Sequence, residues 1–88
     1  MARTKDGTAY EITGCQGAAW VVLIHGLGLT RASTWGGIAP ILAQEFQILS
    51  YDLLGHGETD LPSGHVDLKR LGQQVIDLMD DLSIDRAA

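Results

Sequence analysis

The feature that most constrains the fold is a run of five apolar residues that ends abruptly at a glycine-rich segment. Residues 20–24 (Trp-Val-Val-Leu-Ile) show no alternation of apolar and polar side chains, and His25-Gly26-Leu27-Gly28 follows directly. A strand that is apolar on both faces is typical of the interior of a parallel sheet, because helices cover both faces of such a sheet. The run therefore predicts a strand in the middle of a parallel sheet, with a tight turn at its carboxyl end.

A second strand is predicted over residues 46–51 (Phe-Gln-Ile-Leu-Ser-Tyr), which end at Asp52 before another glycine-rich loop. Residues 33–45 predict a helix between the two strands, with Ser33 or Thr34 as its cap. Because proline fits the first turn of a helix, its regular part is predicted to start near Ile38–Pro40, after a loose turn around Gly36-Gly37. Two strands joined by a helical crossover run parallel. The buried side of this helix is predicted at Trp35, Ile38, Ile41 and Leu42.

The last predicted element is an amphipathic helix. Its apolar residues recur three or four positions apart, which forms one stripe on a helix, and Asp67 is suited to cap it. Gln74 and the charged residues lie on the predicted polar side. Residues 8–14 predict a short, half-buried strand at the start of the chain. The order β-β-α-β-α predicts an α/β fold with a mostly parallel sheet; the stripe comprises Leu68, Leu71, Val75, Leu78 and Leu82.

Size and charge limit the function classes. The 88 residues make one small domain or part of one. The net charge of −5, without a basic stripe, argues against nucleic acid or an anionic membrane as a partner. No apolar run reaches the roughly 18–20 residues that span a bilayer, and the first residues lack a secretory signal, so we expect a cytoplasmic protein. The single Cys15 excludes an internal disulfide, and the histidine spacing predicts no metal site.

Two glycine-rich loops are the candidate site, because ligands bind beyond the carboxyl ends of parallel strands. In His25-Gly26-Leu27-Gly28, backbone N–H groups could stabilise an oxyanion, or the segment could be a tight turn without chemistry; the tetrapeptide alone leaves both open. In the loop from Asp52 to Thr59, the aspartate can accept hydrogen bonds from loop N–H groups while Gly55 and Gly57 take unusual dihedral angles. We interpret this second loop as structural.

Together, in this order and spacing, the two loops resemble the N-terminal part of an α/β-hydrolase over residues 8–88. The resemblance implies that residues 1–88 are a partial domain, with the Leu27 N–H in the oxyanion hole and His25, Gly26 and Gly28 shaping that loop. The family's Gly-x-Ser-x-Gly nucleophile elbow, and the acid and histidine that follow it, are absent from the sequence. Ser33, Ser50, Ser63 and Ser83 lack the context of the elbow.

The resemblance, strongest to esterases and enol-lactonases, implies a parent enzyme that hydrolyses an ester, a lactone or a similar bond of a small-molecule substrate, without a cofactor or metal. Some members of the family use aspartate as the nucleophile, and these residues do not separate the two groups. The 88-residue chain alone is expected to be inactive.

Two alternatives come from other classes. The chain could be a non-catalytic fragment or pseudo-enzyme module. It could also be a dinucleotide-binding segment, because Gly26 and Gly28 begin such a fingerprint and Asp52 ends the next strand; Arg31, however, stands where the third glycine belongs. A P-loop is excluded, because Gly-Lys-Ser/Thr is missing. His56 is interpreted as structural.

Overall fold

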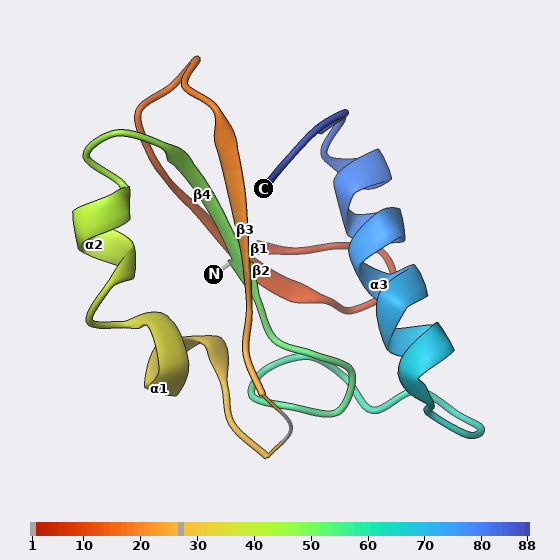
Figure 1. Cartoon of the computed structure of the whole chain (residues 1–88). Helices are drawn as coiled ribbons and strands as arrows, with labels where there is room; N and C mark the ends of the chain where they lie inside the picture. Colours follow the sequence, from red (N-terminus) through yellow and green to blue (C-terminus); the bar gives the residue numbers. More distant parts are fainter. Residues whose placement is uncertain (1, 27) are drawn as a thin grey trace.

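The sheet of this protein lies between two layers of helix. The computed structural model describes residues 2–26 and 28–88. Their elements are β1 (Ala2–Arg3), β2 (Ala9–Gly14), β3 (Trp20–Ile24), α1 (Arg31–Trp35), α2 (Ala39–Leu42), β4 (Gln47–Tyr51) and α3 (Leu68–Asp81). Figure 1 shows the sheet edge-on, with α1 and α2 on one side and α3 on the other. The predicted strands and the last helix are present, and the α/β class is confirmed.

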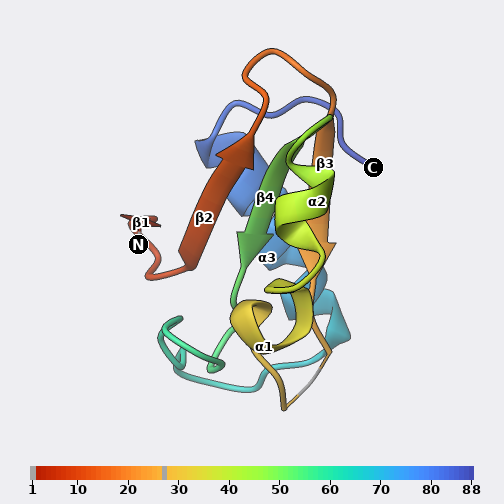
Figure 2. The same cartoon turned by 90° about the vertical axis from the view of Figure 1, so that its left-hand side faces the viewer.

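The sheet is mixed, so the prediction of a mostly parallel sheet is wrong for these residues. The strand order is β1-β2-β4-β3. Of the three pairings among the described strands, β3 with β4 is parallel, and β2 is antiparallel to both β1 and β4. The connections explain these directions. A turn over residues 15–19 reverses the chain after β2, and the crossover through α1 and α2 returns β4 parallel to β3 but on the side facing β2 (Figure 2).

β3 lies at the edge of the described sheet. Its apolar run alone is typical of a strand in the middle, but the resemblance to α/β-hydrolases predicts an edge here, because the strand that lies beside it in that family is not among these residues. The end of the chain meets the outer side of β3. The Val22 N–H donates to the Ala88 carbonyl at 2.9 Å, and the Ala88 N–H donates to the Trp20 carbonyl at 3.0 Å. One residue that bonds to both neighbours of the residue opposite it is the pattern of a parallel ladder. Ala88 therefore forms one parallel rung beside β3, where both views place the C-terminus (Figures 1 and 2).

The main core lies between the sheet and α3. The predicted cap is confirmed, because the Arg70 N–H donates to Asp67 Oδ1 at 2.9 Å. The predicted stripe is also confirmed apart from its first residue: Leu78 is 1% exposed, whereas Leu68 is 81% exposed. Gln74 was predicted on the polar side and is instead buried. The buried core cluster comprises Leu49, Tyr51, Leu53, Leu78 and Ile84.

The other face of the sheet carries two short helices where one helix was predicted. Gly36 and Gly37 follow the last residue of α1, and glycine is a poor helix former. Pro40 lies in the first turn of α2, where its missing N–H costs nothing. The predicted regular start near Ile38–Pro40 and the turn at Gly36-Gly37 before it are therefore confirmed, but the residues before that turn form the separate helix α1.

The cap and the buried side of this region differ from the prediction. Thr30 caps α1: its hydroxyl accepts the Ser33 N–H at 3.1 Å, so neither Ser33 nor Thr34 is the cap. Ile38 and Ile41, predicted on the buried side, are 45% and 63% exposed. α1 and α2 contain no fully buried residue. The core of the described chain is therefore concentrated on the α3 side.

Tyr51 carries a hydroxyl into that core without a hydrogen-bond partner among the described residues. The residue is 1% exposed. Burial disfavours the charged phenolate and raises the pKa of Tyr51 to about 12. The hydroxyl therefore weakens the core in which it lies, because a buried polar group without a partner costs about 1–3 kcal/mol.

The Tyr51→Phe substitution is expected to raise the free energy of unfolding at neutral pH by about 1 kcal/mol. In the parent chain, stability is fully present below the unfolded-state pKa of about 10 and falls as pH rises towards 12, because the unfolded phenol ionises first. Tyr51→Phe should reduce that loss. Urea denaturation at several pH values, at concentrations where the chain is monomeric, measures both effects. Tyr10→Phe is the control; weakening by Tyr51→Phe at neutral pH would contradict the argument.

Candidate functional site

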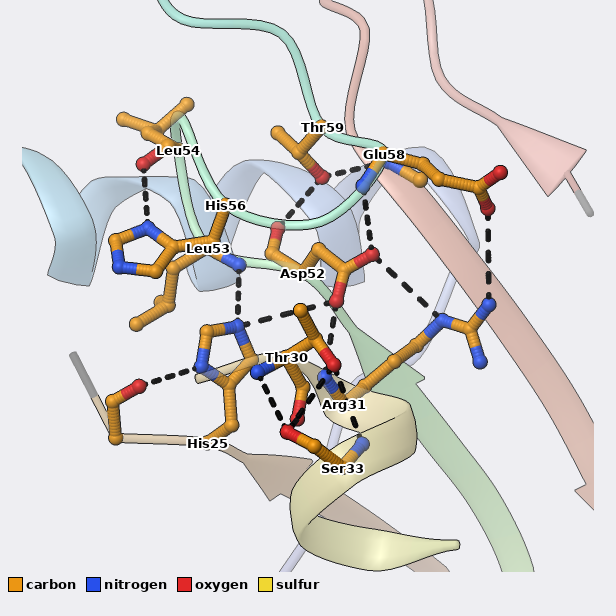
Figure 3. Close-up of polar contacts among 12 residues, drawn as sticks. His25, Thr30, Arg31, Ser33, Asp52, Leu53, Leu54, His56, Glu58 and Thr59 are labelled. Carbon is orange, nitrogen blue, oxygen red and sulfur yellow. Dashed lines mark hydrogen bonds and ion pairs between the residues drawn. The ribbon is translucent and has the colours of Figure 1, made fainter. Parts of the chain in front are cut away.

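The two glycine-rich loops lie side by side at the carboxyl ends of β3 and β4. β3 and β4 are parallel, and their last residues, Ile24 and Tyr51, are partners in the register. The first loop, from His25 to Thr30, and the second loop, from Asp52 to Thr59, therefore leave the sheet together. Figure 3 shows the polar contacts that join them.

Asp52 is the centre of these contacts and is 2% exposed. Its Oδ1 accepts the Arg31 N–H at 2.9 Å, and its Oδ2 accepts the Glu58 N–H at 3.1 Å (Figure 3). Its backbone carbonyl accepts the Thr59 hydroxyl at 2.7 Å, and Thr59 Oγ1 accepts the Ala9 N–H at 2.9 Å. One carboxylate thus joins the start of α1 to the end of the second loop.

Two glycines allow the second loop to close around this carboxylate. Gly55 and Gly57 have φ angles of +74° and +50°, which residues with a side chain rarely adopt. A Cβ atom on Gly57 would collide with the Asp52 carboxylate, and one on Gly55 would lie 2.8 Å from Leu61 Cδ1. The close approach of the backbone to Asp52 therefore depends on glycine at position 57.

His25 connects the first loop to the second and is 3% exposed. The Leu53 N–H donates to His25 Nε2 at 3.0 Å, and His25 Nδ1 lies 2.7 Å from the Gly26 carbonyl oxygen. Because a backbone N–H can only donate, Nε2 carries no proton, and Nδ1–H donates to the carbonyl. Both ring nitrogens are occupied, so in this arrangement His25 is not available as a general base.

His56 makes the reciprocal connection, from the second loop to the first. The Gly28 N–H donates to His56 Nε2 at 2.9 Å, and Nδ1 lies 2.9 Å from the Leu54 carbonyl oxygen. The rings of His25 and His56 are 5.3 Å apart between centroids. The sequence did not indicate this contact, because the glycines beside His56 say nothing about a partner 28 positions earlier.

The guanidinium group of Arg31 lies among three carboxylates. Its nitrogens are 3.8 Å from Glu11, 3.9 Å from Asp52 and 4.0 Å from Glu58, and its side chain is 13% exposed. Asp52 is thus engaged by two backbone N–H groups and this cation. A carboxylate used in this way is not available to bind a ribose hydroxyl, which argues against the dinucleotide-binding alternative.

Gln74 is a further residue that the sequence did not single out. Its Oε1 accepts the Leu54 N–H at 3.1 Å, and its Nε2 donates to the Asp52 carbonyl at 3.1 Å and to Thr8 Oγ1 at 3.2 Å. This buried amide on α3 therefore fixes the start of the second loop through hydrogen bonds to its backbone. Its helical position resembled a polar surface position, because the periodicity of one helix does not report a loop that folds over it.

The predicted oxyanion-hole residue, Leu27, lies outside the described residues. The residues on either side of it are described. The Gly26 carbonyl accepts the Leu29 N–H at 3.2 Å, and Gly28 has a φ angle of +82°. An open, mostly apolar cavity of about 300 Å³ lies beside the first loop. Its lining includes Ile24, His25, Gly26, Tyr51, Leu71 and Val75.

The described residues hold no arrangement of a nucleophile with a base. Ser33 Oγ accepts the Thr30 N–H at 3.0 Å and donates to the Thr30 carbonyl at 3.1 Å, so it serves the cap of α1. Cys15 Sγ donates to the Gln44 carbonyl at 3.1 Å. Over residues 2–26 and 28–88, no cluster of three or more potential metal-ligating side chains occurs, and no helix is long and apolar enough to cross a membrane.

Comparisons with known proteins agree with this geometry. Residues 21–87 match the Alpha/beta hydrolase family. The chain is 31% identical over 77 residues to 3-oxoadipate enol-lactonase 1 of Acinetobacter baylyi, a match that covers 88% of this chain and 28% of that protein.

Two solved structures are similar in both sequence and fold. A hydrolase from Pseudomonas aeruginosa is 35% identical with a TM-score of 0.85, over 98% of this chain and 33% of that one. The enol-lactonase from Burkholderia xenovorans is 36% identical with a TM-score of 0.85, over 91% and 31%. The chain thus spans about a third or less of the length of these relatives. The family predicted from the two loops is confirmed: the chain belongs to the α/β-hydrolase family.

Proposed function

We propose that these residues are the N-terminal part of a hydrolase that cleaves an ester, a lactone or a similar bond of a small molecule. The nucleophile lies beyond residue 88, and the first loop supplies part of the oxyanion hole. The enol-lactonases among the similar proteins support this substrate class. The family alone does not specify it, because one fold supports several reactions.

The pairing of Ala88 with β3 is the observation that carries this proposal. Ala88 lies opposite Val21, since it bonds to the residues on either side of it. A strand continuing from Ala88 would reach the level of Ile24 after about three more residues, in the same parallel direction. The turn after that strand would open beside Gly26, at the edge where the two glycine-rich loops meet. A nucleophile on that turn would face the first loop.

In the proposed reaction, residues 1–88 supply one oxyanion donor, and the residues after Ala88 supply the nucleophile and a second donor. The nucleophile attacks the carbonyl carbon, and the carbonyl oxygen takes up negative charge in the tetrahedral intermediate. The Leu27 N–H donates to that oxyanion together with a second N–H from the later turn. Removal of one such donor typically lowers kcat by about 10²–10³. The cavity beside the first loop is apolar, which suits the uncharged part of an ester or lactone.

Two measurements test this function. The coding sequence after the Ala88 codon is expected to encode a short strand followed by Gly-x-Ser-x-Gly. Gly-x-Asp-x-Gly at that place would indicate a dehalogenase or epoxide hydrolase instead. The absence of both motifs would overturn the proposal. The complete protein is then expected to release p-nitrophenol from p-nitrophenyl acetate and to open lactones, with activity lost on replacement of the elbow serine.

The isolated 88-residue chain is expected to show no turnover of the same esters, because its described residues lack a nucleophile paired with a base. A stopped assay at high protein concentration measures this. Ser33→Ala is the matched variant. Turnover by the isolated chain that Ser33→Ala abolishes would contradict both this prediction and the assignment of the nucleophile to later residues.

A further inference from the structure

We propose that His56 is a positioning residue for the oxyanion loop: it fixes the first loop by accepting the Gly28 N–H. This inference rests on the proposed function, because it assigns His56 a part in that reaction. Its structural basis is independent of the reaction. The Gly28 nitrogen and His56 Nε2 lie 2.9 Å apart, and this hydrogen bond joins the residue directly after Leu27 to the second loop.

The direction of the bond fixes the form of the imidazole. A backbone N–H can only donate, so His56 Nε2 must present its lone pair to Gly28. The proton of the neutral ring is therefore on Nδ1, where it donates to the Leu54 carbonyl at 2.9 Å. The ring is held at both nitrogens by backbone atoms, one from each loop. His56 thus acts as a rigid brace between the loops and does not exchange protons with a substrate in this arrangement.

The brace has a consequence for the oxyanion hole. The Gly28 N–H points to His56 and is not available to a substrate. A glycine-rich loop offers several N–H groups, and the φ angle of +82° at Gly28 shows a backbone that takes a conformation favoured by glycine. His56 engages the Gly28 donor and thereby fixes the backbone next to the proposed oxyanion donor, the Leu27 N–H. Donors stabilise a transition state best when they are held in position before the reaction.

The second histidine supports the same geometry from inside the protein. His25 Nε2 accepts the Leu53 N–H at 3.0 Å, and its ring lies 5.3 Å from that of His56 with a 52° tilt between planes. His25 is buried, whereas His56 is only half-buried. Because His56 is less buried than His25, its substitution is expected to disturb the core less. His56 is therefore the residue at which loop position can be tested apart from folding.

Two amide variants of the complete protein separate the two bonds of the ring. In His56→Asn, the side-chain N–H₂ can occupy the position of Nδ1 and keep the bond to Leu54, but the side chain is too short to reach Gly28. In His56→Gln, the amide oxygen can occupy the position of Nε2 and accept the Gly28 N–H. We expect His56→Asn to lower kcat about tenfold with KM changed less than about twofold, and His56→Gln to restore kcat to within about threefold of the parent.

A readout that does not need catalysis completes the test. In the ¹⁵N-labelled parent protein, a scalar coupling between the Gly28 amide nitrogen and His56 Nε2 across the hydrogen bond is expected. Its absence overturns the proposal whatever the activity. A coupling in a protein without any hydrolytic activity overturns the proposed function instead, and with it the catalytic value of the brace.

Thermal unfolding of the variants distinguishes positioning from general stabilisation. Equal melting temperatures of His56→Asn and His56→Gln, with kcat lowered in the first alone, support the proposal. Parent-like kcat in His56→Asn overturns it, as does an equal loss of kcat in both variants.

Discussion

The Asp52→Ala substitution is expected to lower the free energy of unfolding by about 4 kcal/mol, the largest effect of any single side chain in the two loops. It removes the acceptor of the Arg31 and Glu58 N–H groups, and each such loss in a buried setting costs about 1–3 kcal/mol. It also removes one of the carboxylates around the Arg31 guanidinium. Stabilities of about 0.05–0.15 kcal/mol per residue are typical, so a loss of this size would remove between about a third and nearly all of the stability of an 88-residue chain.

Urea denaturation followed by circular dichroism measures this loss. Asp52→Asn keeps the shape but leaves one acceptor oxygen, so about half of the loss is expected. Asp60→Ala is the matched control, because its side chain is 70% exposed and pairs with Arg3 at 3.2 Å on the surface. An exposed pair contributes roughly 0–1 kcal/mol. Equal stability of Asp52→Ala and Asp60→Ala would show that Asp52 does not hold the loops together.

The parts of the fold that sequence could predict are those with a local pattern. The apolar run at residues 20–24 predicted a strand, and the three- and four-residue spacing in α3 predicted a helix with one buried side, because both patterns depend only on neighbouring residues. The loops were recognisable for a related reason: glycines at defined offsets are needed where a backbone turns beside Asp52. The order of the two loops then identified the family.

The parts that sequence could not predict depend on residues far apart in the chain. The apolar run alone could not place β3 at an edge, because five apolar residues show the same pattern at an edge as in the middle of a sheet. The burial of Gln74 and the bond from Gly28 to His56 both depend on a loop folding over a distant element. Ile38 and Ile41 were predicted to be buried from their apolar character, but no described element covers them.

The isolated 88-residue chain is expected to self-associate through the outer edge of β3. This strand is terminal in the sheet order, and Ile24 at its carboxyl end is 47% exposed. Ala88 forms one rung beside it, opposite Val21. An apolar strand with backbone N–H and C=O groups along a free edge is a template for pairing with another chain. Light scattering over a concentration series should therefore show a mass that rises with concentration.

The Ile24→Lys substitution is expected to oppose this association, because a charge on an edge strand must be desolvated when a second strand pairs there. Ile76→Lys is the matched control. The exposed fraction of Ile76, 52%, is close to the 47% of Ile24, but Ile76 lies on α3 and not on a strand. The same charge is added in both variants, so a difference between them reports the position and not the net charge. An equal decrease in mass for both variants would assign the effect to general repulsion. A parent chain that stays monomeric with one sharp unfolding transition would show that the edge of β3 is not a template for association.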